Sequence, residues 1–265
     1  MSITTKFSSV TVYCTDTPDL HWEQSSGELL CQREGVHVWY IDKSRFSKEQ
    51  ILNFRKFLSE EEKTKADRFH FEKDQTRYII SHGILNQLIA NYLNIKLTDL
   101  SFEKNKKQKP FITGYPHLQF NLTYSLDYIL IAFRFCPQNQ LEHSNMQIGV
   151  DVEDVTRSID IELIIKDYFT FEEQNEILSA PSPASVFFKL WTRKEALVKA
   201  TGTGLTNQLK TYNLFPPVSK LLIKEQFSSH FYSQKLFIHS FKIDESGFGS
   251  IAVMENDEPL RFIKY

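Results

Sequence analysis

The sequence predicts an α+β protein made of two halves with a similar layout. In each half a strand pattern comes first, helical patterns follow, and strand patterns return at the end. The chain has 265 residues, 41% of them hydrophobic and 24% charged, which is enough apolar material for a core and too much for a disordered polymer. We therefore expect a pseudo-duplicated fold with an antiparallel sheet packed against helices in each half.

The first half is expected over residues 1–143. Alternation with a period of two predicts strands, and apolar residues spaced three and four apart predict helices. These patterns occur in order as a strand at 35–43, helices at 51–58 and 74–93, strands around a basic turn within 100–112, and a hairpin at 118–135. The charged stretch at 59–69 is interpreted as a turn, and the hairpin is expected to turn at Ser125 to Asp127.

The second half is expected over residues 144–265, after a polar stretch at 136–147 that has the composition of a linker. The order of patterns then repeats as a strand from Ile148, helices at 161–169 and about 185–201, and closing strands near 220–227, 235–243 and 249–256. Each half has a size that is typical of a single domain.

Charge and composition exclude several classes of protein. A formal net charge of −2 argues against a protein whose whole surface binds nucleic acid. Three cysteines without a CxxC pair fit a reducing compartment better than a disulfide framework. No stretch approaches the apolar length that spans a bilayer. We therefore predict a cytoplasmic protein that binds neither nucleic acid nor membrane.

The first stretch that indicates a functional site is GVDVE at 149–153. Asp151 and Glu153 are separated by one residue, so on an extended chain both side chains point to the same face. Two like charges at that distance raise each other's pKa and cost stability, unless a positive group such as a metal ion lies between them. The pair therefore predicts a cation site.

The second stretch is the helix expected at about 185–201, which Gly202 and Gly204 can end. Trp191, Glu195 and Lys199 stand four residues apart and share one side of this helix. Taken alone, Glu195 and Lys199 would be an ordinary helical ion pair, and the glycines an ordinary helix stop.

Together the two stretches resemble the 4′-phosphopantetheinyl transferases of the surfactin-synthetase-activating (Sfp) type. The hallmark of that family is a G-[IV]-D-[IV]-E strand followed by W-x-x-K-E-[AS]-x-x-K and G-x-G-L, and both parts are present as GVDVE and WTRKEALVKATGTGL. Weaker features of the first half also match: the RF and DxxR pattern within 57–78, the QKPFI turn and the FNLTYS strand. The resemblance covers most of the chain.

The resemblance implies the two-half fold of that family and its reaction. The 4′-phosphopantetheine arm of coenzyme A is transferred to a serine of an apo acyl or peptidyl carrier protein, and adenosine 3′,5′-bisphosphate is released. Such transfers need a divalent cation on the phosphate oxygens and positive groups that balance the developing charge. By resemblance the second half holds Mg²⁺ through Asp151, Glu153 and Glu195, and the first half contacts the phosphates of coenzyme A.

The resemblance also gives roles to basic and catalytic residues. Lys194 and Lys199 match the helix lysines of the family and are expected to contact coenzyme A, and Lys199 is also expected to stabilise the leaving bisphosphate. Glu173 matches a glutamate proposed as general base for the carrier serine, directly or through water. An acidic surface helix would show the same pattern, so that alternative stays open. The positions that match coenzyme A contacts in the first half are Lys65, Arg77, Lys109, Thr123 and Tyr124.

The sequence departs from the family where coenzyme A is expected to bind. Thr123 and Tyr124 stand where the family usually has Ser and His. A tyrosine hydroxyl can donate a hydrogen bond but cannot carry the positive charge of a protonated histidine. Glu62 falls where some members have a lysine. These departures predict a different contact to the phosphates of coenzyme A.

Two other functions are compatible with parts of the pattern. One is a Mg²⁺-dependent nuclease, because an acidic strand followed by Glu and Lys also describes metal-assisted phosphodiester cleavage. The other is a non-catalytic protein that binds coenzyme A or a carrier. We expect a monomer, because an internally duplicated chain can build its site without a partner subunit.

Overall fold

The computed structural model describes residues 6–18, 20–26, 34–105, 108–136, 148–202, 209–225, 234–254 and 257–265. It confirms the α+β class and divides the chain into two compact units. Unit 1 comprises Met1–Leu20 and Glu142–Pro259, and unit 2 comprises His21–Leu141 and Leu260–Tyr265. The predicted linker lies, except for Cys136, outside the described residues.

Unit 2 is built on a five-stranded sheet with the order β2-β12-β3-β7-β6. Its strands are β2 (Glu23–Gln24), β3 (Val36–Asp42), β6 (Leu118–Ser125), β7 (Tyr128–Phe135) and β12 (Leu260–Lys264). The predicted hairpin is confirmed as the antiparallel pair β6 and β7, with Leu126 in its turn at a φ of 49°. The predicted basic turn joins β4 (Phe102–Lys104) to β5 (Pro110–Ile112) in a small separate sheet.

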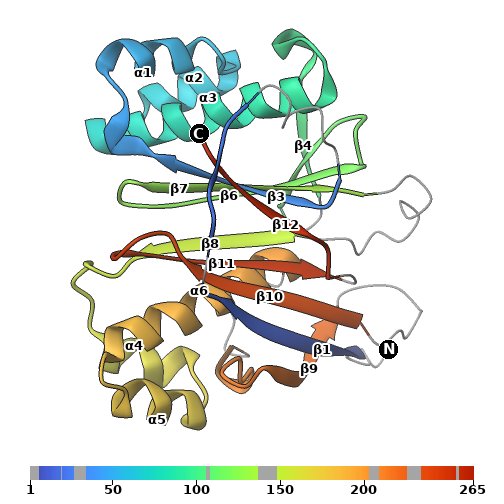
Figure 1. The fold of residues 1–265 in the computed structure, drawn as a ribbon. Coiled ribbons are helices and arrows are strands. Elements are labelled where there is room, and N and C mark those ends of the chain that lie inside the picture. Colours follow the sequence, from blue (N-terminus) through green and yellow to red (C-terminus); the bar gives the residue numbers. More distant parts are fainter. Residues whose placement is uncertain are drawn as a thin grey trace, which may run out of the picture. The chain divides into compact units, whose positions relative to one another are not determined.

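Three helices cover one face of the unit 2 sheet (Figure 1). They are α1 (Lys48–Arg55), α2 (Glu60–Asp67) and α3 (Glu72–Leu93). The turn predicted at 59–69 is wrong, because Ser59 and Glu62 form a reciprocal capping box that begins α2. The long helix α3 supplies the apolar contacts of the core, where Ile84, Ile89 and Tyr92 are fully buried with Trp39 of β3.

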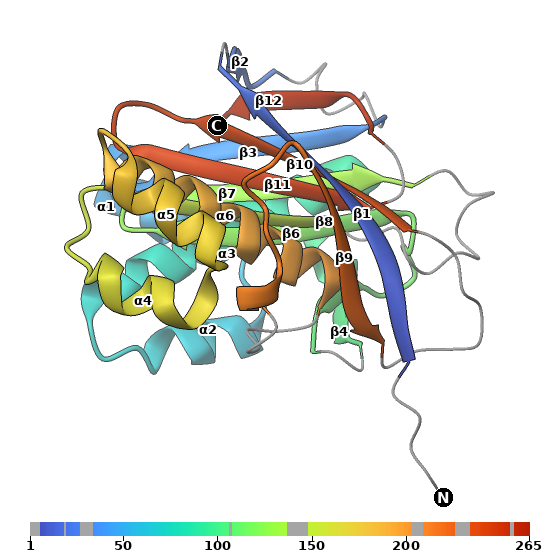
Figure 2. The ribbon, with the colours of Figure 1, turned by 90° about the horizontal axis from the view of Figure 1, so that it is seen from below.

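Unit 1 is built on a second five-stranded sheet with the order β8-β11-β10-β1-β9 (Figure 2). Its strands are β1 (Lys6–Thr17), β8 (Ile148–Asp154), β9 (Val218–Glu225), β10 (Gln234–Lys242) and β11 (Gly247–Met254). Its helices are α4 (Ile161–Tyr168), α5 (Phe171–Ser179) and α6 (Pro183–Thr201). The longest of these, α6, packs on β8, β10 and β11 and ends at Gly202, which adopts the left-handed conformation with a φ of 65°.

The first and last strands differ from the predicted layout. β1 pairs in parallel with β10 and antiparallel with β9, so the start of the chain belongs to the sheet of the second half. β12 pairs in parallel with β3, so the end of the chain belongs to the sheet of the first half. Both sheets are consequently mixed and not purely antiparallel, and the units differ at both ends from the predicted ranges 1–143 and 144–265.

In the described part of the chain, no helix combines the length and apolar character needed to cross a membrane. Cys14 and Cys136 are buried cysteines. Cys31 lies outside the described residues.

Candidate functional site

The candidate site in unit 1 lies where α6 crosses β8, and Gly149 makes the approach of these two elements possible. A Cβ atom at residue 149 would lie 2.2 Å from the Ala196 carbonyl oxygen and 2.4 Å from the Ala200 backbone nitrogen. Both clashing atoms are backbone, so no rotamer change could relieve the overlap. The first residue of GVDVE is therefore a glycine because the strand touches the helix backbone.

This approach brings Lys199 onto the buried carboxylate of Asp151. The Lys199 Nζ atom lies 2.7 Å from Asp151 Oδ1 and donates a second hydrogen bond of 3.1 Å to the Val150 carbonyl oxygen. The Asp151 side chain is 7% exposed and that of Lys199 is 26% exposed. The lysine is thus oriented by β8 while part of it stays accessible to solvent.

Glu195, one turn before Lys199, carries a carboxyl with a strongly raised pKa. Burial raises the pKa of Glu195 to about 7, and the negative charge of Asp151 acts in the same direction. Lys199 opposes this increase, whereas Glu153 adds a smaller increase. Within the described structure the Glu195 Oε1 atom is buried and accepts no hydrogen bond. A buried acceptor beside other carboxylates has the chemistry of a cation ligand.

The predicted triad is brought together only in part. Glu153 is turned toward Arg157, whose Nη1 atom lies 2.5 Å from Glu153 Oε2. Across the described residues, no set of three or more His, Cys, Asp or Glu side chains is arranged to hold a metal ion. Asp151 and Glu195 thus share an electrostatic environment, and Glu153 pairs with a cation of the chain itself.

Arg157 was not singled out from the sequence. Its position four residues after Glu153 is a signal in principle, but i,i+4 pairing is expected only on helices. Here the chain turns directly after β8, and that turn returns the guanidinium to the strand.

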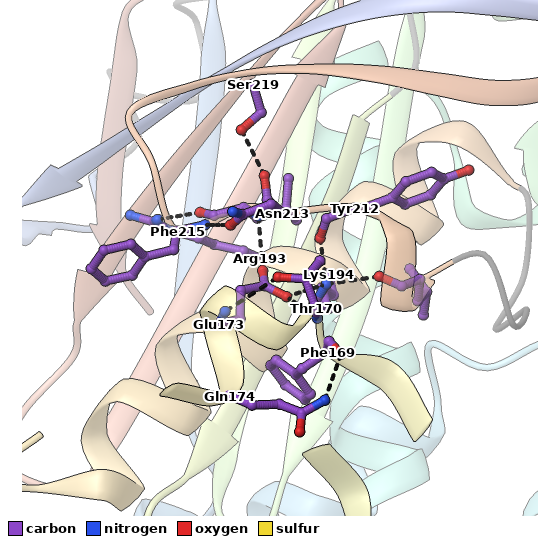
Figure 3. A network of polar contacts seen from close by, with 12 residues as sticks. Phe169, Thr170, Glu173, Gln174, Arg193, Lys194, Tyr212, Asn213, Phe215 and Ser219 are labelled. Carbon is purple, nitrogen blue, oxygen red and sulfur yellow. Dashed lines mark hydrogen bonds and ion pairs between the residues drawn. The ribbon is translucent and has the colours of Figure 1, made fainter. Parts of the chain in front are cut away.

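The structure speaks against the roles predicted for Glu173 and Lys194. Both are fully buried and form an ion pair of 2.8 Å (Figure 3). Glu173 also accepts hydrogen bonds from the backbone N–H groups of Thr170 and Leu214. A carboxylate with no exposed surface and occupied oxygens cannot take a proton from a carrier serine, and a buried ammonium cannot touch coenzyme A.

The predicted residues of unit 2 form two contacts between a cation and an aromatic ring. The Arg77 guanidinium lies 4.3 Å from the ring centre of Tyr124 and donates a hydrogen bond of 2.7 Å to Asp74. The Lys65 Nζ atom lies 5.0 Å from the ring centre of Tyr78. The ring contacts add no counter-charge, whereas the ion pair with Asp74 partly offsets the charge of Arg77.

The other predicted residues of unit 2 are placed differently. Thr123 is buried in β6, whereas Tyr124 is 42% exposed. Lys109 is partly buried, and its backbone N–H donates to Asn105 Oδ1. Glu62, at the position where some members have a lysine, accepts a hydrogen bond of 2.8 Å from Asn86. In unit 1, Gly204, one of the glycines expected to end the site helix, lies outside the described residues.

A cavity of about 320 Å³ opens elsewhere on unit 1. It is lined by the end of β1, the first turns of α6 and the facing ends of β10 and β11, including Asp16, Lys189 and Phe248. Since no predicted site residue lines it, we place the candidate site at the crossing of α6 and β8 and not in this cavity.

Comparison with known proteins supports the resemblance found in the sequence. A model of the 4′-phosphopantetheinyl transferase superfamily matches residues 147–246, and a model of the 4′-phosphopantetheinyl transferase N-terminal region matches residues 45–135. The first match contains Asp151, Glu153, Glu195 and Lys199. β1 lies outside both matches.

Several curated proteins with this activity in their names are similar to the chain. It is 29% identical over 189 residues to 4′-phosphopantetheinyl transferase HetI of Nostoc sp., covering 69% of this chain and 76% of that protein. It is 27% identical over 181 residues to Sfp of Bacillus subtilis, covering 68% and 75%. It is 27% identical over 192 residues to the L-aminoadipate-semialdehyde dehydrogenase-phosphopantetheinyl transferase of Schizosaccharomyces pombe, covering 69% and 74%. The chain belongs to the 4′-phosphopantetheinyl transferase superfamily.

Proposed function

We propose that this protein transfers the 4′-phosphopantetheine arm of coenzyme A to a serine hydroxyl of an apo acyl or peptidyl carrier protein. The serine oxygen bonds to the phosphorus that bears the arm, the pyrophosphate bond breaks, and adenosine 3′,5′-bisphosphate leaves. The hydroxyl proton passes to solvent in the same step. The observation that carries the proposal is the approach of Lys199 and Glu195 to Asp151 within the region that matches the family.

Asp151, Glu153 and Glu195 are the residues proposed to hold Mg²⁺. Their donor set consists of carboxylate oxygens, which hard divalent cations prefer, and Glu195 presents a buried acceptor without a hydrogen-bond partner in the described structure. When bound, Mg²⁺ would neutralise charge on the phosphate oxygens of the substrate. A bound cation would also offset the burial and, to a smaller extent, the repulsion that raise the pKa of Glu195.

Lys199 is proposed to stabilise the leaving bisphosphate. Its Nζ atom is fixed by Asp151 and by the Val150 carbonyl oxygen, while its side chain stays partly exposed. A preoriented ammonium costs little reorganisation when negative charge develops on the leaving group.

Arg77 and Lys65 are proposed to bind phosphate groups of coenzyme A. Tyr124 cannot supply the charge of a histidine, but its ring holds the Arg77 guanidinium, which remains positive at every physiological pH. The family's histidine contact would thus be replaced by an arginine supported on a tyrosine. Lys109 and Thr123 remain further proposed contacts.

Monomeric and cytoplasmic behaviour is proposed as well. The absence of a disulfide at Cys14 and Cys136, the two cysteines within the described residues, is compatible with a reducing compartment. Size-exclusion chromatography with light scattering would test the oligomeric state, and a mass of two chains would contradict the monomer.

The proposed function is tested by incubating the protein with coenzyme A, Mg²⁺ and a panel of apo carriers. Intact-mass spectrometry should show that a carrier gains the phosphopantetheine arm, and a carrier with its acceptor serine replaced by alanine should gain nothing. Asp151→Ala should lose the activity and keep the circular dichroism spectrum of the parent. Binding of coenzyme A without transfer to any carrier would instead identify a non-catalytic binding protein.

A further inference from the structure

Three consecutive residues of α6 directly before Glu195 are polar and buried. Thr192 lies 2.8 Å from Ser250 of β11, hydroxyl to hydroxyl. Arg193 donates hydrogen bonds of 2.8 Å to Ser240 of β10 and 2.7 Å to Asp16 of β1. Lys194 forms its ion pair of 2.8 Å with Glu173 of α5. Each residue is therefore bound to a different part of unit 1.

These contacts fix the rotation of α6 about its own axis. Successive residues of an α-helix point roughly 100° apart. Three neighbouring side chains held by β11, by β10 with β1, and by α5 therefore restrain the helix from several directions. The direction of Glu195 is set by the same restraint, and so is that of Lys199 one turn later.

The contact between Lys194 and Glu173 is closed to substrate. Besides pairing with Glu173, the Lys194 ammonium donates to the carbonyl oxygens of Leu209 and Tyr212, at 2.8 and 2.6 Å. All three of its donors are thus engaged. The side chains of Lys194 and Glu173 are 1% and 0% exposed. A group that receives protons or phosphates must open to the site, and these two do not.

The same pair holds the segment that follows the exit of α6. Glu173 accepts the backbone N–H of Leu214, and Arg193 donates to the carbonyl oxygen of the same residue (Figure 3). Residues 209–214 are therefore bound by α5 and α6 together. The ion pair thus connects α6 to residues 209–214, which follow it in the chain.

We infer that Glu173 and Lys194 are positioning residues, which lock α6 so that Glu195 and Lys199 face Asp151, and that neither takes part in proton transfer. The activity readout of this inference rests on the proposed function. Under this inference Glu173 is not the general base. The ion pair instead supports the reaction by holding α6 in the orientation that the site needs.

The test uses Glu173→Gln, Lys194→Met, the double variant, and Glu172→Gln as a matched control on the exposed side of α5. Glu173→Gln leaves Lys194 buried without a counter-charge, so its melting temperature should fall by about 5–15 °C. The double variant removes the unpaired charge, so it should melt above Glu173→Gln. Its kcat should stay within about tenfold of the parent, with an unchanged acid limb in the pH profile. The control should match the parent in both measurements.

A general base would give a different result. A loss of about 10²-fold or more in kcat, equal in Glu173→Gln and the double variant and accompanied by loss of the acid limb, would overturn the inference, because removing Lys194 cannot restore a missing base.

Hydrogen exchange tests the lock without any activity. Backbone amides in residues 209–214 should exchange faster in Lys194→Met than in the parent, and equal exchange would overturn the inference. If the parent transfers no arm to any carrier, the proposed function fails, whereas the melting and exchange measurements still decide whether the ion pair locks α6.

Discussion

Glu195 and Lys199 lie one turn apart on α6. The surroundings stabilise the charge of Lys199 and destabilise that of Glu195. Lys199 finds a carboxylate at 2.7 Å, whereas Glu195 is buried near the negative charges of Asp151 and Glu153. A carboxyl kept in such a place costs stability, as expected for the proposed cation site. This cost can be measured.

Glu195→Gln should be more stable than the parent at pH 8 and inactive. A carboxyl whose folded pKa is raised to about 7 contributes its stability below the unfolded value of 4.5 and loses it as the pH rises through 7. The amide of Glu195→Gln does not ionise, so the variant does not lose stability in this way as the pH rises. Calorimetry should therefore show a melting temperature about 2–5 °C above the parent at pH 8 and nearly equal at pH 5. A variant that is less stable than the parent at pH 8 would contradict the prediction, whatever its activity.

Tyr124→His should make the binding of coenzyme A depend on pH. The parent presents Arg77 on the Tyr124 ring, and arginine keeps its charge between pH 6 and 8. An exposed histidine at residue 124 would be protonated at pH 6 and neutral at pH 8. The KM for coenzyme A should then increase by about three- to tenfold between these pH values, relative to the parent. Tyr124→Phe, which keeps the ring under Arg77, is the control, and a KM profile parallel to that of the parent would refute the prediction.

At the scale of elements, the site depends on how closely a strand and a helix can approach. The contact between β8 and α6 relies on the absent side chain of Gly149. The sequence signals of both elements are local and strong, so their existence was predictable from periodicity and capping. The close approach was not predictable from periodicity, because a glycine in a strand has several possible causes.

Gly149→Ala should separate α6 from β8. The new methyl group would overlap backbone atoms of Ala196 and Ala200, so the helix must shift, at a cost of about 1–3 kcal/mol in the free energy of unfolding. Lys199 and Glu195 would move away from Asp151, and kcat should fall by about tenfold or more, since small displacements at a reacting centre are costly. Urea unfolding and transfer assays would measure both effects. Ala200→Gly in the same chain should not rescue it, because the overlap involves the backbone; full rescue would show that the side chain was responsible.

For the molecule as a whole, local sequence patterns predicted the fold class and most helices and strands. They did not predict which strands pair when those strands are far apart in the chain. The helices α1, α3 and α6 and the β6 and β7 hairpin follow from periodicity and turn chemistry. Asp151, Glu195 and Lys199 were predictable as a group because the motifs that carry them are long. The burial of Glu173 and Lys194 was not predictable, because an acidic residue in an otherwise exposed stretch gives no sign of a partner on another helix.

A buried histidine of unit 2, His37, makes the stability of the fold depend on pH. Burial lowers the pKa of His37 to about 4, the positive charge of Arg261 adds to this, and Glu23 opposes it. His37 is fully buried, with its Nδ1 atom 2.7 Å from the Tyr92 hydroxyl. Because the folded pKa lies below the unfolded value of 6.5, this contribution is present above pH 6.5 and is lost as the pH falls toward 4.

His37→Gln should weaken this dependence. The amide cannot be protonated in this range, so the melting temperature of the variant should fall less than that of the parent between pH 6.5 and 4. Circular dichroism melts at several pH values would measure the difference. Melting temperatures that fall equally would show that other groups control acid unfolding.

The place of β1 in its sheet has a consequence for biosynthesis. β1 lies between β9 and β10, yet both partners are translated only after most of the chain. Because synthesis begins at the amino end, β1 is made before β9 and β10. Until those strands are made, the backbone N–H and C=O groups on both edges of β1 have no strand partner. Contacts between such distant segments slow folding and expose the waiting strand to aggregation. A nascent chain stalled before Val218 should therefore need a chaperone or another temporary cover for β1, and the full chain released from the ribosome should not.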